Sequence, residues 1–110
     1  MIIEKTRLAT IFKNDEKSIE NFMKDFSENY SKFAKDNIII DFSDYNGEKT
    51  EKILLFLQYS KKHQHNGMSF VIVANGIDIE AIPDDMNIVP TLVEANDIIE
   101  MENIERDLGF

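Results

Sequence analysis

Two histidines, His63 and His65, stand close together at the end of a Lys-rich segment with the sequence KKHQHNG. Two imidazoles at this spacing are candidate metal ligands. The chain contains no cysteine, however, and no third ligand lies near the pair in the sequence. Cationic groups also suit the negative end of a helix dipole. We therefore expect both histidines to be solvated residues that end a helix, and we expect no metal site and no cofactor.

Acidic and hydroxyl side chains follow the apolar run of residues 37–42. Asp41 and Asp44 would flank the carboxyl end of the central strand, where parallel α/β sheets commonly bind ligands. Carboxylates there would suit Mg²⁺, but no glycine run that cradles phosphate accompanies them. The sequence also lacks a nucleophile elbow and a dinucleotide fingerprint. We therefore expect a protein that is not an enzyme.

The segments that would position these side chains begin with a strand pattern. Residues 2–12 are rich in β-branched residues and predict either one long strand or a hairpin, because no Gly, Pro, Asn or Asp marks a turn inside them. From Asp15 the period becomes helical and predicts a helix of about five turns with Asp15 as its cap. Its apolar stripe is typical of a buried helix face: Ile19, Phe22, Met23, Phe26, Tyr30 and Phe33.

Two later apolar runs, residues 37–42 and 69–74, predict strands that are buried on both faces, as in a parallel sheet. A helix from about Gly47 to Lys62 would connect them in a right-handed βαβ unit. A further helical turn is expected over residues 77–82.

The C-terminal third has the clearest boundaries. A short last strand is expected over residues 87–89. Thr91 and Glu94 have the spacing of a capping box, and they predict a final helix that runs to about Asp107, with Gly109 past its end. Together these segments predict one α/β domain over residues 1–110, with a mixed sheet of four to five strands covered by helices.

Charge and composition narrow the surroundings of the protein. No stretch reaches the ~18 apolar residues of a membrane span, and the N-terminal residues lack the apolar core of a signal peptide. The absence of cysteine agrees with a reducing compartment. We therefore expect a cytoplasmic protein that does not associate with membranes. Since no basic cluster occurs beyond Lys61 and Lys62, we also expect no direct binding of nucleic acid.

The net charge of −9 is concentrated in the last third of the chain. Residues 1–75 carry eleven Lys or Arg and eleven Asp or Glu, whereas residues 76–110 carry ten acids against one Arg. The acidic final helix is therefore either a solvated face or a docking face for a basic protein surface. Its candidate docking residues are Glu100, Glu102 and Glu105.

The order of elements and two phrases of the sequence resemble the STAS domain, the fold of bacterial anti-sigma-factor antagonists. The phrases are IIIDFSDYNGEKTEKILLFL over residues 38–57 and SFVIVAN over residues 69–75. The last 22 residues, VPTLVEANDIIEMENIERDLGF, further resemble short STAS-like proteins of Bacteroidetes that are often encoded beside ribonuclease Z. The resemblance implies a STAS-like mixed sheet with parallel βαβ units and a protein-binding role.

The chain departs from that family at the site of its phosphoswitch. Regulated members carry an Asp-Ser-Ser-Gly motif before the second helix, and a partner kinase phosphorylates one of its serines. Those positions fall here on residues 49–52, KTEK, so Thr50 is the phosphorylation candidate, with Ser43 the other hydroxyl nearby. A phosphate is favoured at a helix N-terminus by free N–H groups and the helix dipole. Glu51 would instead supply a permanent negative charge.

Two classes of function follow from these observations. The first is a regulatory protein-interaction module whose partner is an anti-sigma-type kinase or ribonuclease Z. Its candidate contact surface comprises the loop and helix start that follow the central strand, and the acidic turn of residues 78–85. The candidate residues of the loop and helix start are Asp41, Ser43, Asp44, Asn46, Gly47, Thr50 and Glu51. The second is a small-ligand or nucleotide-binding domain that uses the same strand ends. We expect a monomer or a weak dimer, and a self-associating structural domain is a third possibility.

Overall fold

The N-terminal segment forms a β-hairpin, which decides between the two alternatives that its sequence leaves open. In the computed structural model, which describes residues 1–15, 18–45 and 50–109, strand β1 (Ile2–Lys5) pairs antiparallel with β2 (Thr10–Lys13). The turn between them needs no glycine, because the hydroxyl of Thr6 closes it. This oxygen accepts hydrogen bonds from the N–H groups of Leu8 (3.3 Å) and Ala9 (3.1 Å) and donates one to the carbonyl of Ala9 (3.0 Å).

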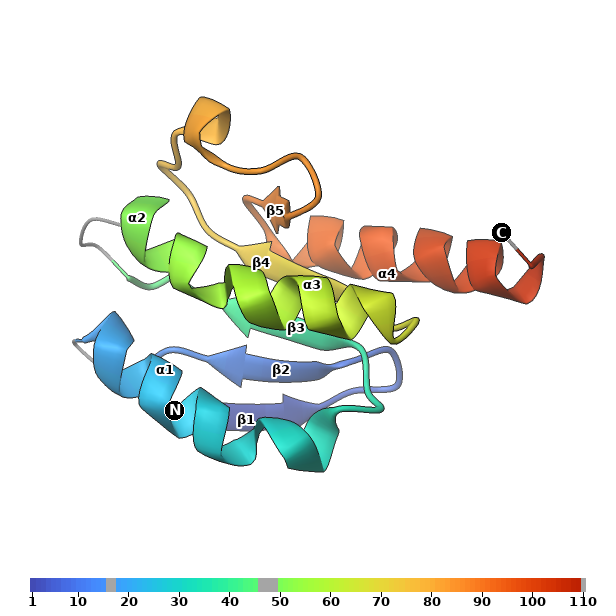
Figure 1. Ribbon diagram of the computed structural model, residues 1–110, viewed down its shortest axis with the longest axis horizontal. Helices are drawn as coiled ribbons and strands as arrows, with labels where there is room; N and C mark the ends of the chain where they lie inside the picture. Colours follow the sequence, from blue (N-terminus) through green and yellow to red (C-terminus); the bar gives the residue numbers. More distant parts are fainter. Residues whose placement is uncertain (16–17, 46–49, 110) are drawn as a thin grey trace.

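The remaining strands run parallel to β2 and complete a five-stranded mixed sheet in the order β1-β2-β3-β4-β5 (Figure 1). Strands β3 (Ile38–Asp41) and β4 (Phe70–Val73) are buried along their whole length, and β5 (Asn87–Val89) forms the second edge. The parallel βαβ arrangement and the α/β fold class are therefore confirmed, and the architecture is consistent with a STAS-like fold.

Two helical segments cover the front face of the sheet (Figure 1). The first comprises α1 (Ile19–Asn29) and the 3₁₀ turn η1 (Tyr30–Phe33), so the helix is confirmed. The predicted cap at Asp15 is wrong. The hydroxyl of Ser18 caps the helix by accepting a backbone hydrogen bond from its first turn at 3.2 Å, whereas Asp15 pairs with the N-terminal ammonium of Met1.

The second covering segment is a helix interrupted by a tighter turn. It comprises α2 (Thr50–Ile53), the 3₁₀ turn η2 (Leu54–Phe56) and α3 (Leu57–His65). The predicted end at Lys62 is therefore too early, because the helix continues until a glycine with a φ of 83° follows it. The predicted start at Gly47 lies outside the described residues.

An aromatic core fills the space between the front helices and the sheet. Its centre is Phe26, whose ring meets that of Phe12 edge to face at a centroid distance of 5.0 Å and that of Phe56 at 5.5 Å. Edge-to-face pairs of this kind add to the stabilisation that burial itself supplies. Six phenylalanines are completely buried in this layer: Phe12, Phe22, Phe26, Phe42, Phe56 and Phe70.

A single helix, α4 (Leu92–Asp107), covers the back face of the sheet. The core beneath it is aliphatic and smaller: Ala9, Ile11, Ile39, Val71, Val73, Ala95 and Ile99. The predicted pairing of Thr91 with Glu94 at the start of this helix is confirmed. The N–H of Glu94 donates to the hydroxyl of Thr91 at 3.2 Å, and that hydroxyl donates to the carboxylate of Glu94, also at 3.2 Å. Gly109 follows the helix with a φ of 82°.

The connection between β4 and β5 carries the further helical turn that the sequence predicts. It is the 3₁₀ turn η3 (Ile79–Ala81), and the side chain of Asp78 caps it by accepting from the N–H of Glu80 at 3.2 Å. Within the described ranges, no helix is long and apolar enough to cross a membrane.

Candidate functional site

The carboxyl end of β3 holds three of the predicted contact residues in one turn. Asp41 is 8% exposed, and its carboxylate accepts a hydrogen bond from the N–H of Ser43 at 2.9 Å. Asp44 is exposed and pairs with Lys13 from the end of β2 at 3.1 Å, which raises the pKa of the lysine. Asp41 therefore shapes the turn, while Ser43 and Asp44 present their side chains to solvent.

The same end of the sheet brings together two segments that are far apart in the sequence. The N–H of Asp78, before η3, donates a hydrogen bond to the hydroxyl of Thr50, the first residue of α2, at 3.1 Å. Glu51 is exposed next to this contact. Asn46 and Gly47 lie outside the described residues. Thr50 and Glu51, the two predicted contact residues at the start of α2, therefore lie beside the loop that carries η3.

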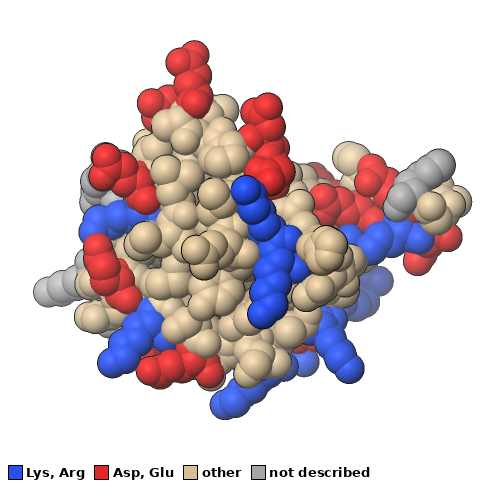
Figure 2. Space-filling model, viewed as in Figure 1, with Lys and Arg blue, Asp and Glu red and all other residues tan. Residues whose placement is uncertain are grey.

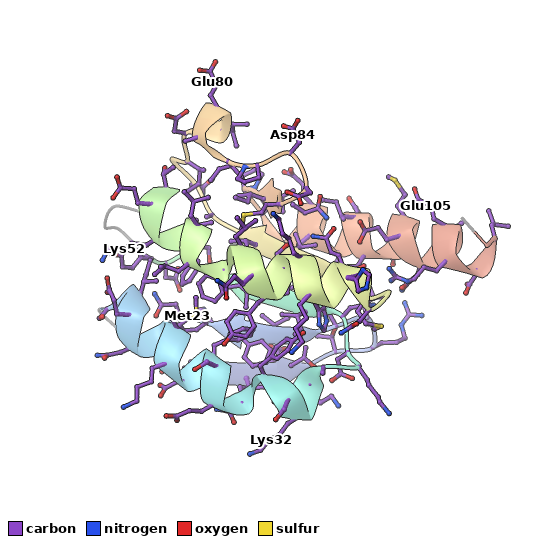
Figure 3. The ribbon with its side chains drawn as sticks, viewed as in Figure 1. Met23, Lys32, Lys52, Glu80, Asp84 and Glu105 are labelled. Atoms are coloured by element: carbon purple, nitrogen blue, oxygen red, sulfur yellow. The ribbon has the colours of Figure 1, made fainter. Side chains whose placement is uncertain are left out.

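The loop around η3 is an apolar prominence ringed by acids. Ile79 is 65% exposed, and it lines two hollows of about 160 and 220 Å³. They are lined mainly by the apolar side chains Ile77, Ile79, Ile82, Met86 and Ile88. The side chains of Glu80 and Asp84 point away from the body of the molecule (Figure 3). Acidic side chains gather on the surface of this loop (Figure 2). This loop and the Asp41 turn form one end of the domain, which we call the carboxyl-end surface (residues 41–45, 50–51 and 77–85).

The three glutamates of the predicted docking face on α4 do not share one face. Glu100 and Glu105 are exposed, and Glu105 lies on the part of α4 that projects past the sheet (Figure 3). Glu102 is half-buried and turned toward the sheet. Its carboxylate accepts hydrogen bonds from the hydroxyl of Ser69 at 2.6 Å and from the amide of Asn87 at 3.4 Å. Any acidic docking face on α4 therefore excludes Glu102.

A partly buried polar network fastens the end of α4 to the amino ends of β3 and β4. The guanidinium of Arg106 donates to the hydroxyl of Ser69 at 3.1 Å and to the side-chain carbonyl of Asn37 at 3.3 Å. The same carbonyl accepts from the N–H of Ser69 at 2.9 Å. Because buried polar groups need such partners, Arg106 acts as an anchor of the helix and not as a free surface charge.

His63 is fully buried, so the prediction that both histidines are solvated is wrong for this residue; His65 is exposed. The Nε2 atom of His63 donates to the backbone carbonyl of Asp36 at 2.6 Å, and Nδ1 accepts from the hydroxyl of Tyr30 at 2.8 Å. Burial lowers the pKa of His63 and, together with Tyr59, raises the pKa of Tyr30. With both nitrogens bonded, the ring is a neutral part of the core and holds no metal.

The opposite end of the sheet gathers cations that are separated in the sequence. Lys5 and Arg7 from the hairpin turn and Lys35 from the loop before β3 line one groove of about 310 Å³. Asp36 lies in the same groove and pairs with Lys5 at 3.4 Å. The expectation that basic residues cluster only at Lys61 and Lys62 is therefore wrong. Strands β2 and β3 are parallel neighbours, so the loops that precede them lie side by side and bring these cations together.

Within residues 1–15, 18–45 and 50–109, no three His, Asp or Glu side chains are grouped closely enough to hold a metal ion. No protein-family model matches the chain, and no curated protein sequence matches it at a significant level. The geometry of the chain itself therefore carries the functional argument.

Proposed function

We propose that this chain is a non-enzymatic, regulatory protein-interaction module of the STAS type that acts in the cytoplasm and binds another protein through its carboxyl-end surface. The observation that carries the proposal is the hydrogen bond between the N–H of Asp78 and the hydroxyl of Thr50, at 3.1 Å. It ties the η3 loop to the start of α2, so that the two segments present one continuous surface.

The composition of this surface suits a protein partner. It combines an exposed apolar residue, Ile79, with exposed acids that include Asp44, Glu51 and Glu80. Interfaces commonly have an apolar centre and a polar rim, and complementary charges on the partner speed association. A partner with a basic rim is therefore expected, and the resemblance to STAS domains suggests an anti-sigma-type kinase or ribonuclease Z.

Thr50 is the candidate control point of this surface. A phosphate on its hydroxyl would place about two negative charges next to Glu51 and Asp78 and would remove the hydroxyl proton. We expect phosphorylation to repel the η3 loop and to weaken partner binding. Thr50→Glu should therefore reduce partner capture more than Thr50→Val does, because valine removes the hydrogen bond without adding charge.

Capture of partners by the tagged protein from native lysate, with identification by mass spectrometry, tests the proposal. Glu80→Lys should reduce capture of the main partner about tenfold, since like charges at an interface are costly. The matched control is Glu28→Lys, which makes the same change at an exposed position on α1 and should leave capture unchanged. Equal capture by both variants, or a thermal shift with a nucleotide library in place of a protein partner, would contradict the proposal.

A further inference from the structure

Helix α4 is apolar on two opposite faces. Its inner face packs Ala95 and Ile99 against the sheet with no exposed surface. Its outer face carries four large apolar side chains at 8-, 3- and 4-residue intervals, a spacing that aligns them along one side of a helix. Their exposed fractions are high: Val93 71%, Met101 60%, Ile104 59% and Leu108 66%. We call these four residues the outer stripe.

Acidic residues border the outer stripe on both sides. At about 100° of rotation per residue, Glu100 and Asp107 lie along one side of the stripe and Glu94 and Glu105 along the other. Asp97 lies within it, and all five carboxylates are exposed. The one basic residue of the helix, Arg106, is turned inward to Ser69 and Asn37. The outer face of α4 thus offers apolar contacts and negative charge but no cation of its own.

The charge layout selects the kind of partner that covers this stripe. A second copy of the chain, paired through the same face, would set acidic borders against acidic borders, and like charges repel. The last turns of α4 also project past the sheet (Figure 1). We infer that the outer stripe docks an amphipathic helix of a partner protein, one whose apolar side chains are flanked by Lys or Arg.

This inference concerns a surface separate from the carboxyl-end surface and stands without the proposed function. Five of the ten acids of residues 76–110 lie along this apolar stripe and do not form a continuous charged face. An amphipathic helix contacts its partner through apolar anchors at such spacings, here Met101, Ile104 and Leu108. The bordering acids would set the orientation and the charge preference of the docked helix.

Two synthetic helical peptides test the inference. Both have the same length and the same Leu stripe; one carries Lys and the other Glu on the flanks. Fluorescence anisotropy with the intact chain should show binding of the Lys peptide, weakened at least ~10-fold for the Glu peptide. Replacing Met101 and Ile104 together by Asn should weaken binding of the Lys peptide by a similar factor. Leu55→Asn, a matched change at a residue that is 48% exposed on η2, should have no effect.

Three further measurements separate the alternatives. The double variant Glu100→Gln, Glu105→Gln should weaken binding of the Lys peptide and reduce the salt dependence of that binding. Glu80→Lys should leave binding of the Lys peptide unchanged. Absence of binding, or binding that the Met101 and Ile104 substitutions leave intact, would overturn the inference. Sedimentation equilibrium would overturn the inference if it showed concentration-dependent dimers that the Met101 and Ile104 substitutions abolish. The outer stripe would then bind a second copy of the chain. Binding to lipid vesicles that the same substitutions abolish would also overturn it.

Discussion

The two faces of the sheet are built differently. The front face is covered by two helical segments and sealed by an aromatic layer, in which Phe26 alone makes ring contacts with five other side chains, those of Phe12, Tyr30, Phe56, Tyr59 and Phe70. The back face is covered by α4 alone over small aliphatic residues, and the outer side of α4 is apolar again. We therefore expect the front face to supply most of the stability, whereas the outer side of α4 and the carboxyl-end surface are exposed.

The largest effect should come from the centre of the front face. Phe26→Ala removes a fully buried ring and leaves a cavity, so it should lower the free energy of unfolding by about 4 kcal/mol. For a domain with roughly 5–15 kcal/mol of total stability, this is a loss of between about a quarter and four-fifths of the total. Urea denaturation followed by circular dichroism measures the loss. A loss below about 1 kcal/mol would show that the front layer is not the main source of stability.

A smaller loss is expected on the back face. Ile99→Ala removes a fully buried aliphatic side chain between α4 and the sheet and should cost about 3 kcal/mol. Hydrogen exchange should accelerate first in α4, because one helix covers this side. If exchange in α1 rises by as much as exchange in α4, the two faces unfold as one unit and the contrast between them is lost.

The hydrogen-bonded pair of Tyr30 and His63 inside the front layer should contribute less to the free energy of unfolding than either apolar residue. Tyr30→Phe keeps the ring but removes the hydroxyl that donates to Nδ1 of His63 at 2.8 Å. It leaves a buried acceptor without this donor, and the expected cost is about 1.5 kcal/mol. Thermal denaturation measures it, with Tyr45→Phe as the control at a residue that is only partly buried. An unchanged melting temperature for Tyr30→Phe would mean that water replaces the hydroxyl.

The smallest effect should be a dependence of the protein's stability on pH that comes from His63. Burial depresses the pKa of this histidine in the folded protein, so the unfolded chain binds the proton more readily. The stability that the neutral ring contributes is complete above the ordinary histidine pKa of about 6.5 and falls as the pH drops toward the folded value. The melting temperature should therefore fall between pH 7.5 and 5.5, and His63→Gln should remove this part of the slope.

Glu20 provides an internal reference for that experiment. Its pairing with Lys52 lowers its pKa to about 2, from an ordinary value of 4.5, so its contribution is lost only at lower pH. If the melting temperatures of the wild type and of His63→Gln changed equally with pH above 5.5, the pH dependence could not be assigned to His63.

Much of the fold could be predicted because its signals are local. The consecutive apolar residues of β3 and β4 and the capping box at Thr91 are each written within a few neighbouring residues. The turn at Thr6 left two alternatives because a hydroxyl signals a turn more weakly than glycine does. His63 could have been placed correctly, because it follows Phe56 and Ser60 at 7- and 3-residue intervals on one helix face, and all three are buried.

The candidate surfaces depend on contacts that the sequence does not encode locally. Arg106 bonds to partners 37 and 69 residues away, and these bonds make its side chain an anchor of α4. Lys5, Arg7 and Lys35 share a groove only because β2 and β3 are neighbours. Likewise, the contact between Thr50 and Asp78 spans 28 residues, and it is the link that joins the predicted loop to η3.

Hydrogen exchange of the protein, alone and saturated with its captured partner, tests most directly whether the front face is structural and the carboxyl-end surface docks the partner. We predict slower exchange in residues 41–45, 50–53 and 76–86 on binding, with exchange in α1 unchanged. Slower exchange confined to α1 and α3, with the carboxyl-end surface unaffected, would contradict it.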